Sequence, residues 1–240
     1  KSYKIEAGLK GLWQSIAQFD IDGDGDKDYL LGNWGLNTKL NANRENPLKM
    51  YYLDFDNNGS TETILAQEKN SKYYPVNGLD MLVGQLSYLR KKFPNYKSFA
   101  GKSIEEIFDK EQLEKAEILE VETLASGYLL NDDGNFSFKA FKNPLQISPI
   151  TAFLEHDFNK DGKTEMLIGG NYFGTIPYHG KFDQLAGSIL QSVDTYIEAK
   201  DLGINFTQKA VISLDILNFE DQDYLLVTYN NHKPQVYKLN

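Results

Sequence analysis

The sequence predicts an all-β protein built from about four repeated hairpin units and interrupted by a helical segment. An acidic nine-residue pattern occurs at three places in the chain. Short apolar-rich runs flank each occurrence, as expected of strands. One stretch near the middle instead places its apolar residues at helical spacing. We therefore expect one domain over residues 1–240, with a helical insertion at residues 77–118.

The composition supports a packed core and restricts the possible partners. The 240 residues are 41% hydrophobic and 13% aromatic, which is sufficient for a core. The formal net charge of -9 argues against nucleic acid and against insertion into or binding on an anionic membrane, since both surfaces attract basic patches. No apolar run is long enough to span a bilayer. The chain has no cysteine, so a disulfide framework and thiolate zinc sites are excluded.

The first acidic pattern runs from Asp20 to Asp28 and has a glycine, Gly25, at its sixth position. Calcium takes about six to eight oxygen ligands, so alternate carboxylates on a tight loop can converge on one ion. The glycine tolerates the sharp bend that such a loop requires. The flanking residues resemble strands, so we predict a strand-loop-strand calcium site. Its predicted ligands are Asp20, Asp22, Asp24, Asp26 and Asp28.

The same pattern recurs in two further loops, which carry Gly59 and Gly162 at the sixth position. Apolar runs again precede and follow each loop, so the repeated unit is a hairpin. The predicted metal ligands are Asp54, Asp56, Asn58 and Glu62 in the second loop, and Asp157, Asn159, Asp161 and Glu165 in the third. Calcium is therefore predicted at three sites.

A fourth copy of the pattern is degenerate. When Asp215 is aligned with Asp20, Asp223 aligns with Asp28 and the following strand residues also correspond. Two metal positions have become Leu217 and Phe219, however, and hydrophobic side chains cannot bind calcium. The sequence therefore predicts a hairpin at Asp215–Asp223 without calcium.

The acidic loops have an alternative interpretation without metal, because Asp, Asn and Gly are all favoured in hairpin turns. Without a cation, however, each loop would crowd several carboxylates that repel one another by about 1 kcal/mol per pair. We therefore favour metal binding. The first loop carries one more ionised ligand than the other two, so we expect it to bind calcium most tightly.

With these loops in view, the chain resembles the FG-GAP/VCBS repeat family. Its calcium-binding members, such as integrin α-subunits, carry Asp-x-Asp-x-Asp-Gly-x-x-Asp between the first two strands of a β-propeller blade. Residues 11–13, 31–37 and 131–136 look closer to secreted proteins of the ASPIC/UnbV, cartilage-acidic-protein-like type. The resemblance covers about residues 11–67 and 120–240. It implies a β-propeller or propeller sector, calcium in the loops, and recognition rather than catalysis.

The chain departs from the family in its spacing, because the loops are unevenly separated and a full ring of blades does not fit. It is either a sector of a larger propeller or a compact version of four units. Pairing of a strand at residues 2–6 with the last unit, at residues 235–239, would cover an exposed sheet edge. We therefore expect the N-terminal strand to pair with the last unit.

The helical segment is predicted in two parts. Apolar residues fall on one helical face from Leu79 to Phe93. A second helix is predicted from Ser103 to Ala116, where Ser103 and Glu106 form a capping box. The segment either packs on the flank of the propeller as a lid or forms part of a surface that binds a partner. The long connection at residues 35–47 is a second candidate binding surface.

We find no catalytic constellation in the sequence. His156, His179 and His232 share no spacing typical of a zinc site, and His156 is expected to be a packed core side chain. There is no nucleophile elbow and no phosphate-binding loop. Several aromatic residues near loop ends could stack on a sugar or a protein side chain. They are Trp34, Tyr73, Tyr74, Tyr172, Phe173 and Tyr178.

These observations lead to a functional hypothesis and one alternative. We expect a non-catalytic, calcium-stabilised module that recognises a protein or a glycan. We expect it in an extracellular, periplasmic or cell-surface location, where calcium is about millimolar and fills such loops. The alternative is a secreted enzyme that acts on polysaccharide, with calcium as a structural ion. A deep pocket with two carboxylates outside the loops and flanking aromatic residues would favour the enzyme.

Overall fold

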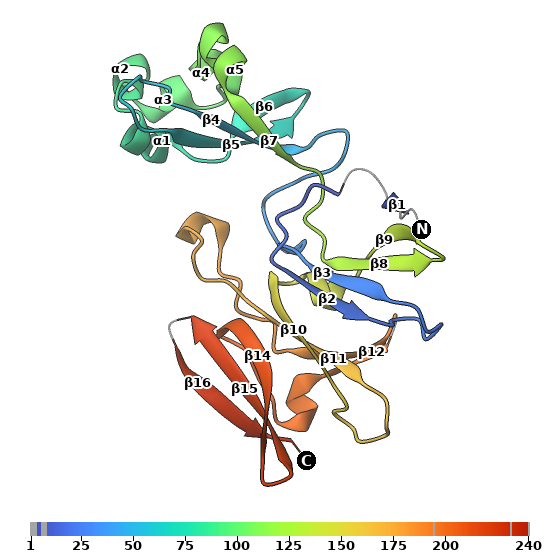
Figure 1. The fold of residues 1–240 in the computed structure, drawn as a ribbon. Helices are drawn as coiled ribbons and strands as arrows, with labels where there is room; N and C mark the ends of the chain where they lie inside the picture. Colours follow the sequence, from blue (N-terminus) through green and yellow to red (C-terminus); the bar gives the residue numbers. More distant parts are fainter. Residues whose placement is uncertain (1–3, 6–8, 194, 231, 240) are drawn as a thin grey trace. The chain divides into compact units, whose positions relative to one another are not determined.

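The computed structural model describes residues 4–5, 9–193, 195–230 and 232–239. The fold is mostly β, as the sequence predicts (Figure 1). Whereas the sequence predicts a single domain, contacts group the chain into two compact units. The first unit contains Leu12–Lys39 and Leu124–Asn240 together with the N-terminal strand, and the second contains Gly8–Gly11 and Leu40–Thr123. No helix in the described residues is long and apolar enough to cross a membrane.

The first sheet of the first unit has five strands in the order β1-β9-β8-β3-β2. Its strands are β1 (Lys4–Ile5), β2 (Ser15–Phe19), β3 (Asp28–Gly32), β8 (Gly127–Asp132) and β9 (Asn135–Ala140). The strands from β2 to β9 form an antiparallel meander. Leu40–Thr123, the main part of the second unit, is inserted into this meander between β3 and β8, which are hydrogen-bonded neighbours although the chain separates them widely.

The N-terminal strand does not close onto the last unit. Lys4 and Ile5 of β1 instead pair in parallel with Asn135 and Phe136 of β9. The expected closure is therefore wrong for the described part of that strand; residues 2, 3 and 6 lie outside the described residues. Pairing with β9 also covers an exposed sheet edge. The edge that is covered belongs to the first sheet and not to the last unit.

The second and third sheets of the first unit are simple antiparallel meanders. The second sheet contains β10 (Ile150–His156), β11 (Glu165–Gly170), β12 (Ser188–Ser192) and β13 (Thr195–Glu198). The third contains β14 (Ala210–Phe219), β15 (Gln222–Asn230) and β16 (His232–Lys238). Short 3-10 helices lie at Asn143–Gln146, Pro177–His179 and Ala199–Leu202.

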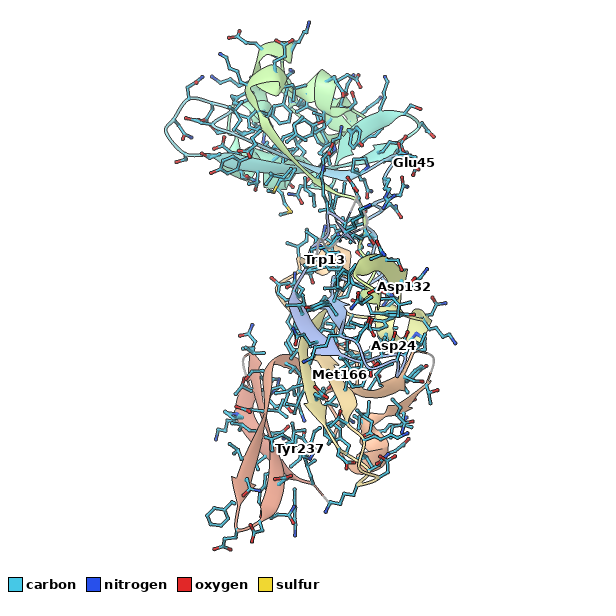
Figure 2. The ribbon with its side chains drawn as sticks, turned by 45° about the vertical axis from the view of Figure 1, so that its right-hand side comes forward. Trp13, Asp24, Glu45, Asp132, Met166 and Tyr237 are labelled. Atoms are coloured by element: carbon cyan, nitrogen blue, oxygen red, sulfur yellow. The ribbon has the colours of Figure 1, made fainter. Side chains whose placement is uncertain are left out.

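The second sheet lies between the other two sheets of this unit (Figure 1). One apolar cluster joins its Met166 and Ile168 to Phe19 and Leu30 of the first sheet. A second cluster contains residues of the second and third sheets. Every residue of β11 is buried, because a strand covered on both faces needs an apolar run instead of an alternating pattern. Figure 2 shows Met166 in the interior of the unit.

The predicted fourth hairpin is confirmed as β14 and β15. Its strands continue almost to the turn, so that Phe219 pairs with Gln222 and only Glu220 and Asp221 connect them. Both turn residues have positive φ values, 51° and 59°. This two-residue turn has the backbone typical of tight hairpins and is much shorter than the three acidic loops.

The second unit combines a small sheet with the helical segment. Its four strands have the order β6-β5-β4-β7. They are β4 (Leu48–Leu53), β5 (Glu62–Lys69), β6 (Lys72–Pro75) and β7 (Glu117–Val121). The helices are α1 (Leu79–Gln85), α2 (Leu89–Lys92), α3 (Tyr96–Phe99), α4 (Ile104–Ile107) and α5 (Lys110–Lys115). Their apolar side chains form one core with residues of β4 and β5.

The predicted helical segment is confirmed, but it is divided into short helices. The predicted second helix is interrupted at Phe108, which is 2% exposed and packs on Phe55 with ring centroids 4.5 Å apart. Burial of this ring requires a break after α4, and Asp109 then begins α5. The capping box is present, because the backbone N–H of Ser103 donates to Glu106 Oε2 at 3.0 Å.

Candidate metal-binding loops

The three acidic loops connect the strands of three antiparallel hairpins. The first joins β2 to β3, the second joins β4 to β5, and the third joins β10 to β11. The predicted arrangement of strand, loop and strand is thus present in each case. The first and third loops belong to the first unit and the second loop to the second unit. Figure 2 shows Asp24 on the loop that follows β2.

A buried carboxylate closes each loop in the same way. The acid at the ninth position accepts a hydrogen bond from the backbone N–H of the residue at the second position, and the donor residue is itself buried. The pairs are Asp28 with Ile21, Glu62 with Phe55, and Glu165 with Phe158, each at 2.9 Å. The second-position side chain therefore anchors the loop in the apolar core while its backbone orients the acid.

The first-position acid and the glycine form a second repeated contact. In each loop a carboxylate oxygen of this acid accepts a hydrogen bond from the glycine N–H. The pairs are Asp20 with Gly25 at 3.0 Å, Asp54 with Gly59 at 2.8 Å, and Asp157 with Gly162 at 2.9 Å. The glycines have φ values of 91°, 88° and 87°. Glycine is needed here because other residues rarely adopt this backbone conformation.

In each loop, three carboxylates gather closely enough to bind a common ion. Within each group, one oxygen of every residue lies within 4.8 Å of the others. The groups are Asp20, Asp22 and Asp24; Asp54, Asp56 and Glu62; and Asp157, Asp161 and Glu165. All three groups could hold a metal ion, and their oxygen donors suit a hard cation.

Asp28 has a different role from the two glutamates at the same position. It is fully buried, and its oxygens accept hydrogen bonds from the backbone N–H groups of Ile21 at 2.9 Å and Asn131 at 2.8 Å. Burial raises the pKa of Asp28, and the two hydrogen bonds act in the opposite direction. Aspartate is one methylene shorter than glutamate, so Asp28 connects the loop to β8 and does not join the group of Asp20, Asp22 and Asp24.

One acid in the first loop and one in the second have a buried oxygen without a partner. Asp26 Oδ1 and Asp56 Oδ1 are both inaccessible to solvent and accept no hydrogen bond. Burial raises the pKa of Asp26, and the negative charges of Asp24 and Asp28 add to the effect. A buried carboxylate oxygen without a partner is costly, and a cation is the ligand that compensates it best. The residues of the first and second loops therefore fit a bound cation.

The two asparagines among the predicted ligands are engaged within their loops. Asn58 Oδ1 accepts a hydrogen bond from the backbone N–H of Ser60 at 2.7 Å. Asn159 Nδ2 donates to Asp161 Oδ2 at 3.0 Å and to Glu165 Oε1 at 2.8 Å. The amide nitrogen of Asn159 thus bridges two acids, and its side chain would have to turn to offer an oxygen to a cation.

No model of a known protein family matches this chain, and no curated protein does.

A polar pocket of about 630 Å³ lies between the first and third loops in the first unit. Asp20 and Asp22 line it on one side, and Asp161 and Glu165 on the other. Among its acids only Glu155 lies outside the loops, and its Oε1 accepts a hydrogen bond from Thr164 Oγ1 at 2.6 Å. This pocket therefore does not contain the two additional carboxylates that would favour a glycoside hydrolase.

Trp34 and Tyr172, which both lie near loop ends, form an aromatic cluster with Phe182. The rings of Trp34 and Tyr172 lie 5.3 Å apart, and Phe182 lies 5.3 Å from Trp34 on another side. Trp34 and Tyr172 each follow a buried asparagine, Asn33 or Asn171, that hydrogen-bonds to the backbone of a neighbouring segment. The signal was visible in the sequence, as a Gly-Asn-aromatic tripeptide after both the first and third hairpins.

His156 is not a fully packed core residue. Its ring contacts Phe158 with centroids 5.2 Å apart, but 21% of its side chain is exposed and its Nε2 lies 3.6 Å from Asp223 Oδ2. The repeat predicted a packed core side chain, and this prediction was wrong because His156 is partly exposed. The reason is that β10 ends beside the third sheet, where a polar partner is available.

Proposed function

We propose that this protein is a calcium-stabilised, non-catalytic binding module of the FG-GAP/VCBS type, located outside the cell or on its surface. The observation that carries the proposal is the recurrence of one loop architecture in three hairpins. Each copy has the same buried anchor, the same glycine and a group of three close carboxylates. Turn propensity alone accounts for the residue types but not for the buried oxygens without partners on Asp26 in the first loop and Asp56 in the second.

The strand connections of the first unit support a sector of a β-propeller. A propeller blade is a four-stranded antiparallel meander. The second sheet has this form, and the strands β2, β3, β8 and β9 have it once the inserted second unit is set aside. In both sheets the acidic loop connects the first two strands, as the family resemblance implies.

Calcium is the cation that the donor set favours. All the predicted ligands supply oxygen, and calcium accepts larger and less regular oxygen sites than magnesium. Zinc prefers nitrogen and sulfur ligands, which the three groups do not contain. Loops of this kind are filled where calcium is about millimolar, which is the basis for proposing an extracellular or surface location.

The aromatic cluster around Trp34 is the best-supported recognition surface. Tyr172 is partly exposed beside Trp34, and Tyr178 is exposed in the same unit. Lys39 lies over the Tyr178 ring at 4.0 Å and donates to the Tyr178 carbonyl at 2.6 Å, which holds this loop in place. Aromatic faces with nearby polar groups suit a sugar ring or a protein side chain.

Calcium binding is tested by differential scanning calorimetry in EGTA and in increasing calcium. We expect the melting temperature to rise with calcium, because a ligand that binds only the folded state stabilises it by mass action. Asp22→Asn, Asp56→Asn and Asp161→Asn should each weaken the response. Asp133→Asn, in the acidic turn between β8 and β9, is the matched control and should respond like the unmodified chain. Equal melting curves with and without calcium would refute the proposal.

Recognition is tested through Trp34 fluorescence in a Trp13→Phe background, since the chain contains only two tryptophans. Titration with a panel of neutral and acidic polysaccharides should change the emission for a glycan ligand, and Tyr172→Ala should abolish the change. An assay for new reducing ends accompanies each titration. Release of reducing ends would favour the polysaccharide-acting enzyme over the binding module.

A further inference from the structure

The first sheet has one face packed on the second sheet, and its other face is covered only in part, by the packing of Trp13 on Phe138. This other face contains an apolar groove of about 480 Å³. Ile5, Ile16, Tyr29, Leu129 and Phe136 line most of it. Ile16, on the edge strand β2, is 66% exposed, although a strand residue of this type is normally buried. Exposed apolar grooves of this kind are typical of interaction surfaces.

The internal repeat shows what covers such a face. When the first and third loops are aligned, Ile16 corresponds to Phe153 and Tyr29 to Met166. Phe153 and Met166 both belong to the apolar cluster between the first and second sheets. The same repeat positions are thus packed against a neighbouring sheet in one copy and left open in the other. The occupant that fits the groove is therefore the apolar face of another β-sheet.

The third sheet offers such a face at the other end of the unit. Its Leu225 and Val227 are buried in the cluster shared with the second sheet. Side chains alternate along a strand, so Leu217, Leu226 and Val236 point to the opposite face. Val236 is 57% exposed, and Phe219 beside the turn is 64% exposed. The same outward face also carries Asp215 and Lys238, so the first unit is a stack of three sheets with exposed apolar side chains at each end and two charges among those of the third sheet.

We propose that two copies of this chain associate, with the open face of the first sheet of one copy packed on the open face of the third sheet of the other. The contact continues the stacking that already joins the second sheet to each of its neighbours. It is heterologous, because each copy contributes a different face. Because the two faces lie at opposite ends of the stack, a pair of copies makes one such contact and leaves a free face at each end for further copies. The inference does not depend on calcium or on the proposed ligand.

The association is tested by analytical ultracentrifugation over a range of protein concentrations. We expect a species of twice the chain mass or more that dissociates on dilution. Ile16→Asp and Val236→Asp should each give a monomer, because every contact uses both faces and each variant replaces an apolar side chain within the contact by a charge. Leu36→Asp is the control, since Leu36 is 54% exposed but lies on neither face, and it should associate normally. Circular dichroism and thermal melting check that the surface variants remain folded.

Mixing the two disruptive variants separates this arrangement from its alternatives. The Val236→Asp chain keeps an intact first-sheet face, and the Ile16→Asp chain keeps an intact third-sheet face. An equimolar mixture should therefore form a one-to-one dimer, although each variant alone is monomeric. The proposal is overturned if the unmodified chain is monomeric at every concentration. It is also overturned if Val236→Asp associates as strongly as the unmodified chain, which would indicate pairing of two first-sheet faces.

Discussion

The backbone N–H of Phe158 donates a hydrogen bond to Glu165 Oε2 at 2.9 Å, across the seven-residue span of the third loop. Phe158 is buried in the cluster between the second and third sheets, and Glu165 is 4% exposed. The contact therefore links the acidic loop directly to the core. It also leaves Glu165 Oε1 facing Asn159, within the group of carboxylates that could bind a cation.

We expect Glu165→Gln to separate the structural and metal-binding roles of this side chain. The amide oxygen can still accept the hydrogen bond from Phe158, so the fold in EGTA should be retained. The loop loses one negative ligand, which should reduce its calcium affinity about tenfold or more. Isothermal titration calorimetry measures the change, with Glu155→Gln as the control outside the carboxylate group. Unchanged affinity at the third loop would exclude Glu165 as a ligand.

The backbone requirement in the loops is tested by Gly59→Ala and Gly78→Ala in the second unit. A Cβ at either position meets no atom within 4 Å, so crowding is not a factor. Gly59 has a φ of 88°, whereas Gly78 has a φ of −73°. We expect Gly59→Ala to lower the free energy of unfolding by about 1 kcal/mol, and Gly78→Ala to have a smaller effect that comes from its position as the N-cap of α1. Urea unfolding in EGTA compares them, and equal effects would contradict the explanation by φ.

Gly170→Ala should be more disruptive for a different reason. A Cβ at Gly170 would lie 2.0 Å from the carbonyl oxygen of Pro149, and Gly32 has the same conflict with the carbonyl oxygen of Ile150 at 2.1 Å. Each contact holds one strand, β11 before Asn171 or β3 before Asn33, against the backbone at the start of β10. We expect a loss of about 1–3 kcal/mol or more for either alanine variant. Urea unfolding measures it, and Trp34 fluorescence should shift in Gly32→Ala; a stable variant with unchanged fluorescence would contradict the close packing.

The separate cores of the two units lead to a prediction for core variants. Leu82 is fully buried among the helices and β4–β5, whereas Ile189 is fully buried between the second and third sheets. Leu82→Ala and Ile189→Ala should each cost about 2–5 kcal/mol. We expect calorimetry to resolve two transitions, with each variant lowering a different one. A single transition shifted equally by both variants would show that the two units unfold together.

Glu106 provides a prediction for acid pH. A hydrogen bond from Lys102, together with the capping bond from the Ser103 N–H, lowers the pKa of Glu106 from 4.5 to about 2. Because the folded state has the lower pKa, its stabilising effect is present above pH 4.5 and is lost as the pH falls towards 2. NMR titration of the Glu106 side chain should show this midpoint. Lys102→Met should raise it towards 4.5, and no change would exclude Lys102 as the main cause.

Much of the local structure could be predicted because it depends on neighbouring residues. The alternation of acids with glycine at the sixth position determines the loop conformation, and the apolar runs on each side determine the hairpins. The capping box at Ser103 and Glu106 is equally local. These features recur wherever the same short pattern recurs.

Contacts between distant segments determine the features that the sequence did not predict. The second hairpin shares a core with the helices and so belongs to the second unit, which no repeat pattern could indicate. Asn131, far along the chain, occupies one oxygen of Asp28 and removes this acid from the carboxylate group. Trp34 and Tyr172 meet because two similar tripeptides lie on adjacent sheets. The sequence alone therefore determined the acidic loops, their glycines and their hairpins. The tertiary structure decided which acids face one another and which side chains share a core, because packing joins residues that chain spacing does not relate.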